Sequence, residues 1–146
     1  MTDRKQELLD VEEAAWTQFH DLTQGLSPAD FGQPVDDSGW TLKDIVWHLG
    51  CWTAKAGRVL ERIKAGTYTA EDEDTDAANE AYLQEGRKQD LDTVKAEWIS
   101  ARMRAREAWA ALDQITPEAE EWFVEIGPEH FDEHLPQVRS FLERRV

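Results

Sequence analysis

Cysteine is almost absent from this sequence, since Cys51 is its only representative among 146 residues. A single thiol cannot close a disulfide within the chain, and it cannot build a zinc site from several cysteines. Cys51 follows His48 by one helical turn, so a thiolate ligand is conceivable, although an ordinary half-buried thiol is the simpler interpretation. The low cysteine content and the lack of an apolar signal segment after Met1 lead us to expect a cytoplasmic protein.

Basic side chains and long apolar runs are scarce as well. The 16 Lys and Arg residues face 31 Asp and Glu residues, which gives a formal net charge of -15 at pH 7. A field of that sign repels the phosphates of nucleic acids and anionic lipid surfaces, so we expect neither as a partner. No stretch of about 18 apolar residues occurs, so no membrane-spanning helix is expected.

Signals for β-strands are weak, because sustained apolar–polar alternation and Asn-Gly or Asp-Gly turns are both missing. Helical periodicity, in contrast, occurs over four long segments. The apolar fraction of 40% is enough for one hydrophobic core. These features predict an all-α four-helix bundle that occupies residues 1–146 as a single domain. The four long helices are expected at about 3–24, 41–66, 90–114 and 128–144.

Shorter elements are expected between the long helices. Ser27 can cap a short helical turn that begins with Pro28. Thr41 and Asp44 form a capping-box pattern at the start of the second long helix. A short helical piece is expected at 77–86, and a turn or short helix is expected from Thr116. The acidic stretch 71–76 predicts a solvated connector, because its spacing does not match a calcium-binding EF-hand loop.

Apolar residues at three- and four-residue steps mark the predicted core. The Arg- and Glu-rich face of the third long helix is expected in solvent, and Pro136 is expected to kink the last helix. The expected core positions are Leu8, Val11, Ala15, Phe19, Leu22, Leu42, Ile45, Val46, Leu49, Trp52, Ala56, Val59, Leu60, Ile63, Val94, Trp98, Ala101, Ala105, Ala108, Trp109, Leu112, Phe131, Leu135, Val138, Phe141 and Leu142.

Three of the four histidines form a candidate metal site. His130 and His134 lie one turn apart on the same helix face, so both imidazoles can reach one ion about 2.0–2.1 Å away. His48 falls at the border of the second helix's apolar face, where its ring can point into the bundle. Three protein ligands leave a position open for water or substrate, as in catalytic metal sites. His20 lies on a polar face and is expected at the surface.

Two alternatives to a catalytic metal site stay open at this point. The motif His-Phe-Asp-Glu-His differs from the metalloprotease pattern His-Glu-x-x-His, so no peptidase is expected. Glu129 and Glu133 flank the histidine pair, but helix geometry turns them partly away, which leaves no evident general base. The bundle could therefore sequester a metal or small molecule without turnover, or its histidines could coordinate nothing.

Two segments resemble the DinB/YfiT-like superfamily. They are Trp40-Thr-Leu-Lys-Asp-Ile-Val-Trp-His-Leu-Gly-Cys-Trp52 and Pro128-Glu-His-Phe-Asp-Glu-His-Leu-Pro-Gln-Val-Arg139. The stretch 76–80 and the helix 91–112 are also similar in layout. That superfamily includes the metal-binding domains of mycothiol-dependent maleylpyruvate isomerases and small stand-alone relatives of the DfsB/ClbS type. The resemblance covers nearly the whole chain.

The resemblance implies a four-helix bundle with one divalent ion, zinc, nickel, iron or manganese, on His48, His130 and His134. It further implies chemistry that depends on a low-molecular-weight thiol, such as S-transfer to a small electrophile, or hydrolytic detoxification. A divalent ion can support this chemistry because it lowers the pKa of a bound thiol. Relatives are often dimers, and a Trp-rich flank would suit a homodimer. Candidate residues for binding the thiol or substrate are Trp47, Trp52, Asn79 and Glu80.

Overall fold

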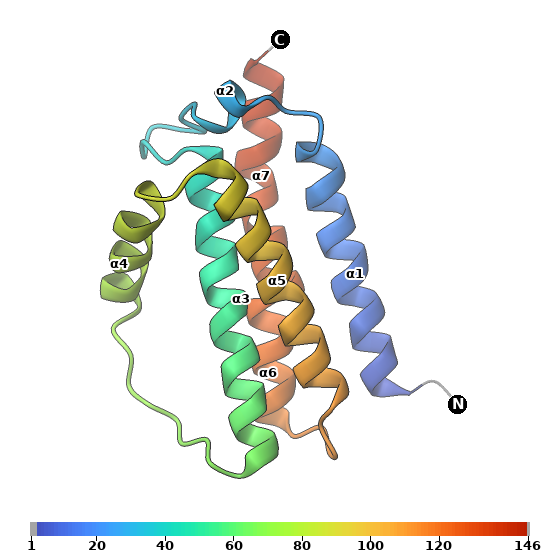
Figure 1. The fold of residues 1–146 in the computed structure, drawn as a ribbon. Coiled ribbons are helices and arrows are strands. Elements are labelled where there is room, and N and C mark those ends of the chain that lie inside the picture. Colours follow the sequence, from blue (N-terminus) through green and yellow to red (C-terminus); the bar gives the residue numbers. More distant parts are fainter. Residues whose placement is uncertain (1–2, 146) are drawn as a thin grey trace.

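The computed structural model describes residues 3–145 as an all-α bundle (Figure 1). Within these residues the only β-structure is one isolated bridge between Pro34 and Thr41. No helix in this part of the chain combines the length and the apolar character needed to cross a membrane. The helices are α1 (Arg4–Thr23), α2 (Pro28–Phe31), α3 (Leu42–Ala65), α4 (Thr75–Arg87), α5 (Leu91–Ala110), α6 (Pro117–Ile126) and α7 (Pro128–Arg144).

The register between α3 and α5 shows that these two neighbours run in the same direction. A Cβ built on Gly50 would lie 3.4 Å from the Trp98 Cα, and one on Gly57 would lie 3.5 Å from the Ala105 Cα. Parallel neighbours need a long return connection, which residues 66–90 provide. Figure 1 shows α4 as part of this return, standing outside the bundle beside α3.

The bundle has four members, of which α1, α3 and α5 are single helices. The fourth consists of α6 and α7, which follow one another along one line in Figure 1. The last helix was expected at 128–144, and α7 has those bounds. The turn or short helix expected from Thr116 is a helix of ten residues, with Thr116 as its cap. Gly127 separates the two helices with φ -90° and ψ -108°, and α7 passes through Pro136 without interruption.

The expected caps are present, and most predicted helix ends agree with the structure to within about two residues. Ser27 with Asp30 and Thr41 with Asp44 both form complete capping boxes, and Gly66 ends α3 in the left-handed conformation. The exception is α5, which ends at Ala110 rather than at Gln114. Residues 71–74 are exposed and lie outside any helix, as expected of a solvated connector, whereas α4 begins at Thr75.

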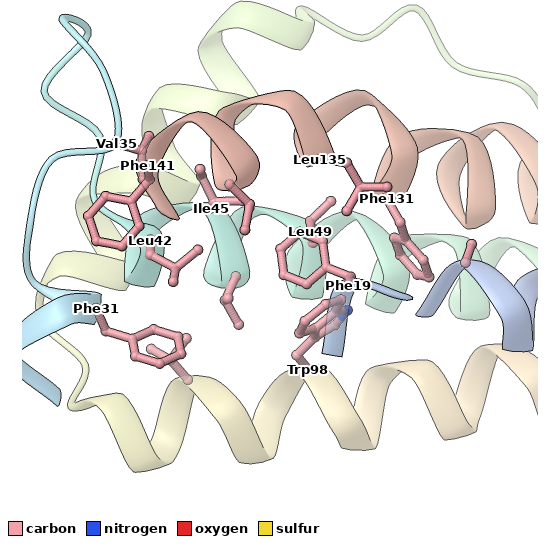
Figure 2. Close-up of a cluster of buried hydrophobic side chains, with 14 residues drawn as sticks. Phe19, Phe31, Val35, Leu42, Ile45, Leu49, Trp98, Phe131, Leu135 and Phe141 are labelled. Carbon is pink, nitrogen blue, oxygen red and sulfur yellow. The ribbon is translucent and has the colours of Figure 1, made fainter. Parts of the chain in front are cut away.

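The core gathers between the long helices and the loop before α3. Figure 2 shows aromatic and aliphatic side chains from these elements pointing toward one another, among them Phe19, Leu49 and Phe131. Nearly all predicted core positions are buried, because the helical periodicity matches the packed faces. Val11 is the clear error, since its side chain is 46% exposed. Leu22, Ile63 and Leu142 are half-buried at the edge of the core.

The polar face of α5 is partly buried, contrary to the expectation that it lies in solvent. Arg102 donates to both carboxylate oxygens of the buried Glu12 on α1, each at 2.8 Å. Arg106 donates to the same carboxylate at 2.7 Å and to the Leu9 carbonyl at 2.9 Å. A buried carboxylate with two guanidinium partners has its charge compensated, so this cluster joins α1 to α5.

The junction at Gly127 generates a stability prediction. A Cβ at this position would lie 2.4 Å from the Phe123 carbonyl oxygen, so Gly127→Ala must displace backbone. We expect the substitution to lower the free energy of unfolding by about 1–3 kcal/mol. Gly25→Ala is the matched control, because its Cβ would meet nothing within 4 Å. Urea unfolding measures both variants, and equal midpoints would contradict this account of the junction.

Candidate metal centre

The packing of α3 determines where His48 points. Gly50 and Gly57 face α5, and each lies on nearly the opposite side of the helix from His48, because helical positions advance by about 100° per residue. His48 therefore faces away from α5 and toward the first two turns of α7, which carry His130 and His134. Its side chain is buried, with 7% of its surface exposed. The edge of its ring packs against Trp40, with ring centroids 5.3 Å apart.

The three imidazoles converge on one point. The Nε2 atoms of His48 and His130 are 3.0 Å apart. The ring centroid of His134 lies 5.1 Å from that of each of the other two rings. One ring nitrogen from each histidine lies within 4.8 Å of the other two. The structure thus brings together the three residues that the sequence predicted as ligands.

Burial keeps two of these rings neutral at pH 7. Desolvation, together with the neighbouring imidazoles, lowers the pKa of His48 to about 3. Desolvation, followed by the charge of His134, lowers the pKa of His130 to about 4, and the Ile126 carbonyl acts weakly in the opposite direction. Neutral imidazoles carry the lone pairs that metal ions bind, so the ligands need not lose a proton first.

A hydrogen-bond relay orients His134. Gln137 donates from Nε2 to the Asp36 carboxylate at 2.9 Å, and its Oε1 lies 2.6 Å from Nδ1 of His134. Since the carboxylate only accepts, the Gln137 amide must face it with its nitrogen, and Oε1 must face the imidazole. Nδ1 of His134 therefore carries the proton and donates it to Oε1. This leaves the lone pair on Nε2.

Asp36 is itself held in its charged form. Its carboxylate accepts from the Ser38 backbone N–H at 2.9 Å and also from the Ser38 hydroxyl. The bonds from Ser38 and Gln137 lower the pKa of Asp36 below its ordinary value. A metal-ligating histidine commonly donates its second nitrogen to such an outer partner, so the Asp36–Gln137 relay has the form of an outer shell.

The donor set fits one divalent transition-metal ion. Three neutral imidazoles suit zinc, nickel, iron or copper. The 3.0 Å approach of two Nε2 atoms demands either a shared proton or a common cation. In addition, Nδ1 of His48 and Nδ1 of His130 are buried without a well-formed hydrogen bond, so these two rings are held by packing and by the contact between their Nε2 atoms. Cys51 does not join the group, and burial raises the pKa of its thiol to about 12.

The three histidines lie in the wall of a cavity of about 560 Å³. That volume is within the range of small-ligand sites, which is about 300–1,000 Å³. The cavity opens between α3, α4, α6 and α7, so the centre is accessible to a ligand. Its other lining residues are Trp40, Trp52, Thr75, Asn79, Glu125, Ile126 and Glu133.

Two of the four predicted binding residues line this cavity. Trp52 donates its indole N–H to Oδ1 of Asn79 at 2.7 Å, and both side chains face the cavity. Trp47 and Glu80 are not among its lining residues. The Trp47 ring packs over Gly86 of α4, where a Cβ would lie 2.3 Å from the ring. Glu80 is exposed and accepts a hydrogen bond from Gln84.

Two acidic residues line the cavity. Glu133, which was expected to turn partly away from the histidine pair, is one of them, and Glu125 of α6 is the other. Glu129 is exposed and is not among the lining residues. His20 lies elsewhere, stacked on Trp16 at 4.6 Å.

Sequence reasoning missed several residues of the site. Gln137 could have been found, since a residue three positions after His134 is its neighbour on the helix surface. Asp36 lies in a loop and Glu125 on a helix that the sequence did not clearly mark, so no periodic signal placed either one beside the histidines.

The family comparison agrees with this arrangement. The family described as mycothiol maleylpyruvate isomerase N-terminal domain matches residues 13–135, a range that contains His48, His130 and His134. No significant match was found among curated proteins or among solved structures. Because the match extends over most of the sequence, this chain belongs to the family of mycothiol maleylpyruvate isomerase N-terminal domains, within the DinB/YfiT-like superfamily.

Proposed function

We propose that this protein is a metal-dependent enzyme that joins a low-molecular-weight thiol to a small electrophile. The observation that carries the proposal is the convergence of three imidazoles, two of them held neutral by burial, in the wall of an open cavity. Structural metal sites are closed by a fourth protein ligand, whereas catalytic sites keep a position open. The family description, which names mycothiol, supports a thiol as co-substrate.

His48, His130 and His134 would hold the ion. When bound, a divalent ion supplies a lowered pKa for a thiol at the open position, so that thiolate exists at neutral pH. The Asp36–Gln137 relay fixes the orientation of His134 in advance. Burial of His48 and His130 disfavours a second proton on either ring, so each neutral imidazole can offer a nitrogen lone pair to the ion.

The remaining cavity residues would bind and orient the ligands. Trp40 and Trp52 give the cavity aromatic walls, against which an apolar electrophile can pack. Asn79 uses its carbonyl oxygen to accept from Trp52, so its amide N–H groups remain as donors for a ligand. Thr75 adds a hydroxyl from the first turn of α4.

Metal content is the first test of this proposal. We expect about one transition-metal ion per wild-type chain and far less in His130→Ala, because the variant loses one of three ligands. Mass spectrometry of protein made without a histidine tag and incubated with nickel and zinc measures the ratio. His20→Ala is the matched control, since His20 lies outside the centre and should leave the content unchanged. Absence of metal in wild type would contradict the proposal.

The relay behind His134 gives a second prediction. Gln137→Leu keeps the three ligands but removes the acceptor that fixes the His134 tautomer. We expect metal affinity to fall about 10- to 100-fold, the usual cost of losing such an outer partner. Competition with a coloured chelator measures the affinity, and Gln18→Leu on the exposed face of α1 serves as control. Unchanged affinity would show that packing alone orients His134.

Turnover separates the enzyme from a sequestering bundle. With metal-loaded protein, mycothiol and a fluorogenic alkylating reagent, we expect many equivalents of conjugate per chain and loss of activity after chelation. A protein that only sequesters would saturate at one ligand per chain and form no conjugate. His130→Ala should also lose the activity, whereas His20→Ala should retain it.

A further inference from the structure

The cavity has no cationic side chain in its wall. Of its lining residues two are carboxylates, Glu125 and Glu133, and none is Lys or Arg. Within the described part of the chain, neither carboxylate forms a salt bridge. Glu12, in contrast, has its charge compensated by two arginines. Both glutamates are exposed, so solvent screens their charge, but none of the described cations pairs with it and it remains available to a ligand.

The cations near the cavity are engaged elsewhere, Arg144 with the Val35 carbonyl beside Asp36 and Lys55 with Glu73. Lys55 lies over the ring of Trp52, 5.4 Å from its centroid, but it is paired with Glu73. Asp74 caps α4 directly before Thr75, and Asp36 stands behind His134 at the end of its relay. Each of these neighbours is either neutralised or negative. A ligand that enters the metal-free cavity therefore approaches a negative potential.

We propose that Glu125 and Glu133 select the ligands of this cavity by charge, admitting ammonium-bearing and neutral molecules and excluding carboxylates. The inference rests on the proposed function in taking a small thiol as the ligand. With a divalent ion on neutral imidazoles, the two carboxylates balance the charge of the ion. A thiolate then adds one negative charge and a carboxylate tail adds a second, which the two glutamates repel.

Aromatic walls reinforce the same preference. An ammonium group can lie over the face of an indole, and both Trp40 and Trp52 line the cavity. A neutral hydroxyl or amide can accept from Asn79 and donate to either glutamate. A carboxylate finds only uncharged donors there, since Thr75 and Asn79 carry no positive charge. The ligand class is thus a small thiol with an ammonium or neutral polar tail.

Three small thiols with different tails can test the selection. Cysteamine, 2-mercaptoethanol and mercaptoacetate carry an ammonium, a hydroxyl and a carboxylate, respectively. Titrated into protein loaded with Co²⁺, each gives a dissociation constant from the thiolate-to-cobalt absorption band, without any turnover. At fixed pH and ionic strength we expect the affinity of cysteamine relative to mercaptoacetate to be about tenfold higher in wild type than in protein that lacks the two glutamate charges, with 2-mercaptoethanol between them.

Isosteric variants assign the selection to the two glutamates. In Glu125→Gln/Glu133→Gln the ratio of the two dissociation constants should shift about tenfold toward mercaptoacetate, while the effects of thiol acidity and chelation stay the same. Glu129→Gln is the matched control, because it removes one charge from the exposed face of α7 near the histidine pair, and it should keep most of the wild-type ratio. A ratio that is unchanged in the double variant would overturn the proposal.

A different outcome would separate this inference from the proposed function. If none of the three thiols changes the cobalt spectrum, the proposed function is wrong, because no thiol binds the ion. Ligands without a thiol then test whether the two glutamates still select by charge. Benzylamine and benzoate, titrated against the tryptophan fluorescence of metal-free protein, serve for this, because Trp40 and Trp52 line the cavity. A preference for benzylamine that disappears in the double variant supports the charge selection, and the lack of any preference overturns it.

Discussion

The close approach of α3 to α5 is the constraint on which the site depends. Gly50 and Gly57 allow the two helix backbones to pack closely along parallel axes. The opposite side of α3 is then directed toward α7, and His48 lies on that side. The same approach forces the long return between parallel neighbours, which places α4 beside α3 and supplies Asn79 to the cavity. The packing of α3 against α5 thus determines where His48 and Asn79 lie.

The fold and the ligand set were predictable because each depends on local periodicity. The spacing of His130 and His134 fixes their common face whatever the rest of the chain does. His48 follows from the apolar face of its own helix, at whose border it lies. Caps such as Thr41 with Asp44 are likewise local, and the structure confirms them. The match of residues 13–135 to the family is consistent with these patterns.

What the sequence did not predict depends on contacts between distant segments. The partner of Glu12 on α5 is 90 residues away, and nothing in its own helix shows that its charge will be buried. Val11, one position earlier, fits the apolar periodicity but faces solvent. Trp47 belongs to the predicted signature, yet its ring packs on Gly86 because α4 returns beside α3. Loop residues such as Asp36 have no periodicity from which their position can be inferred.

The three histidines differ in how they are held, and this difference bears on how the centre forms. A polar relay orients His134, whereas packing and the contact between their Nε2 atoms hold His48 and His130, whose Nδ1 atoms lack a well-formed hydrogen bond. Unpartnered buried polar atoms destabilise the metal-free protein, because no hydrogen bond replaces the contacts with water that they lose on folding. An ion on the facing nitrogens would offset that cost for the site as a whole. Metal binding and stability of the α3–α7 contact should therefore be coupled.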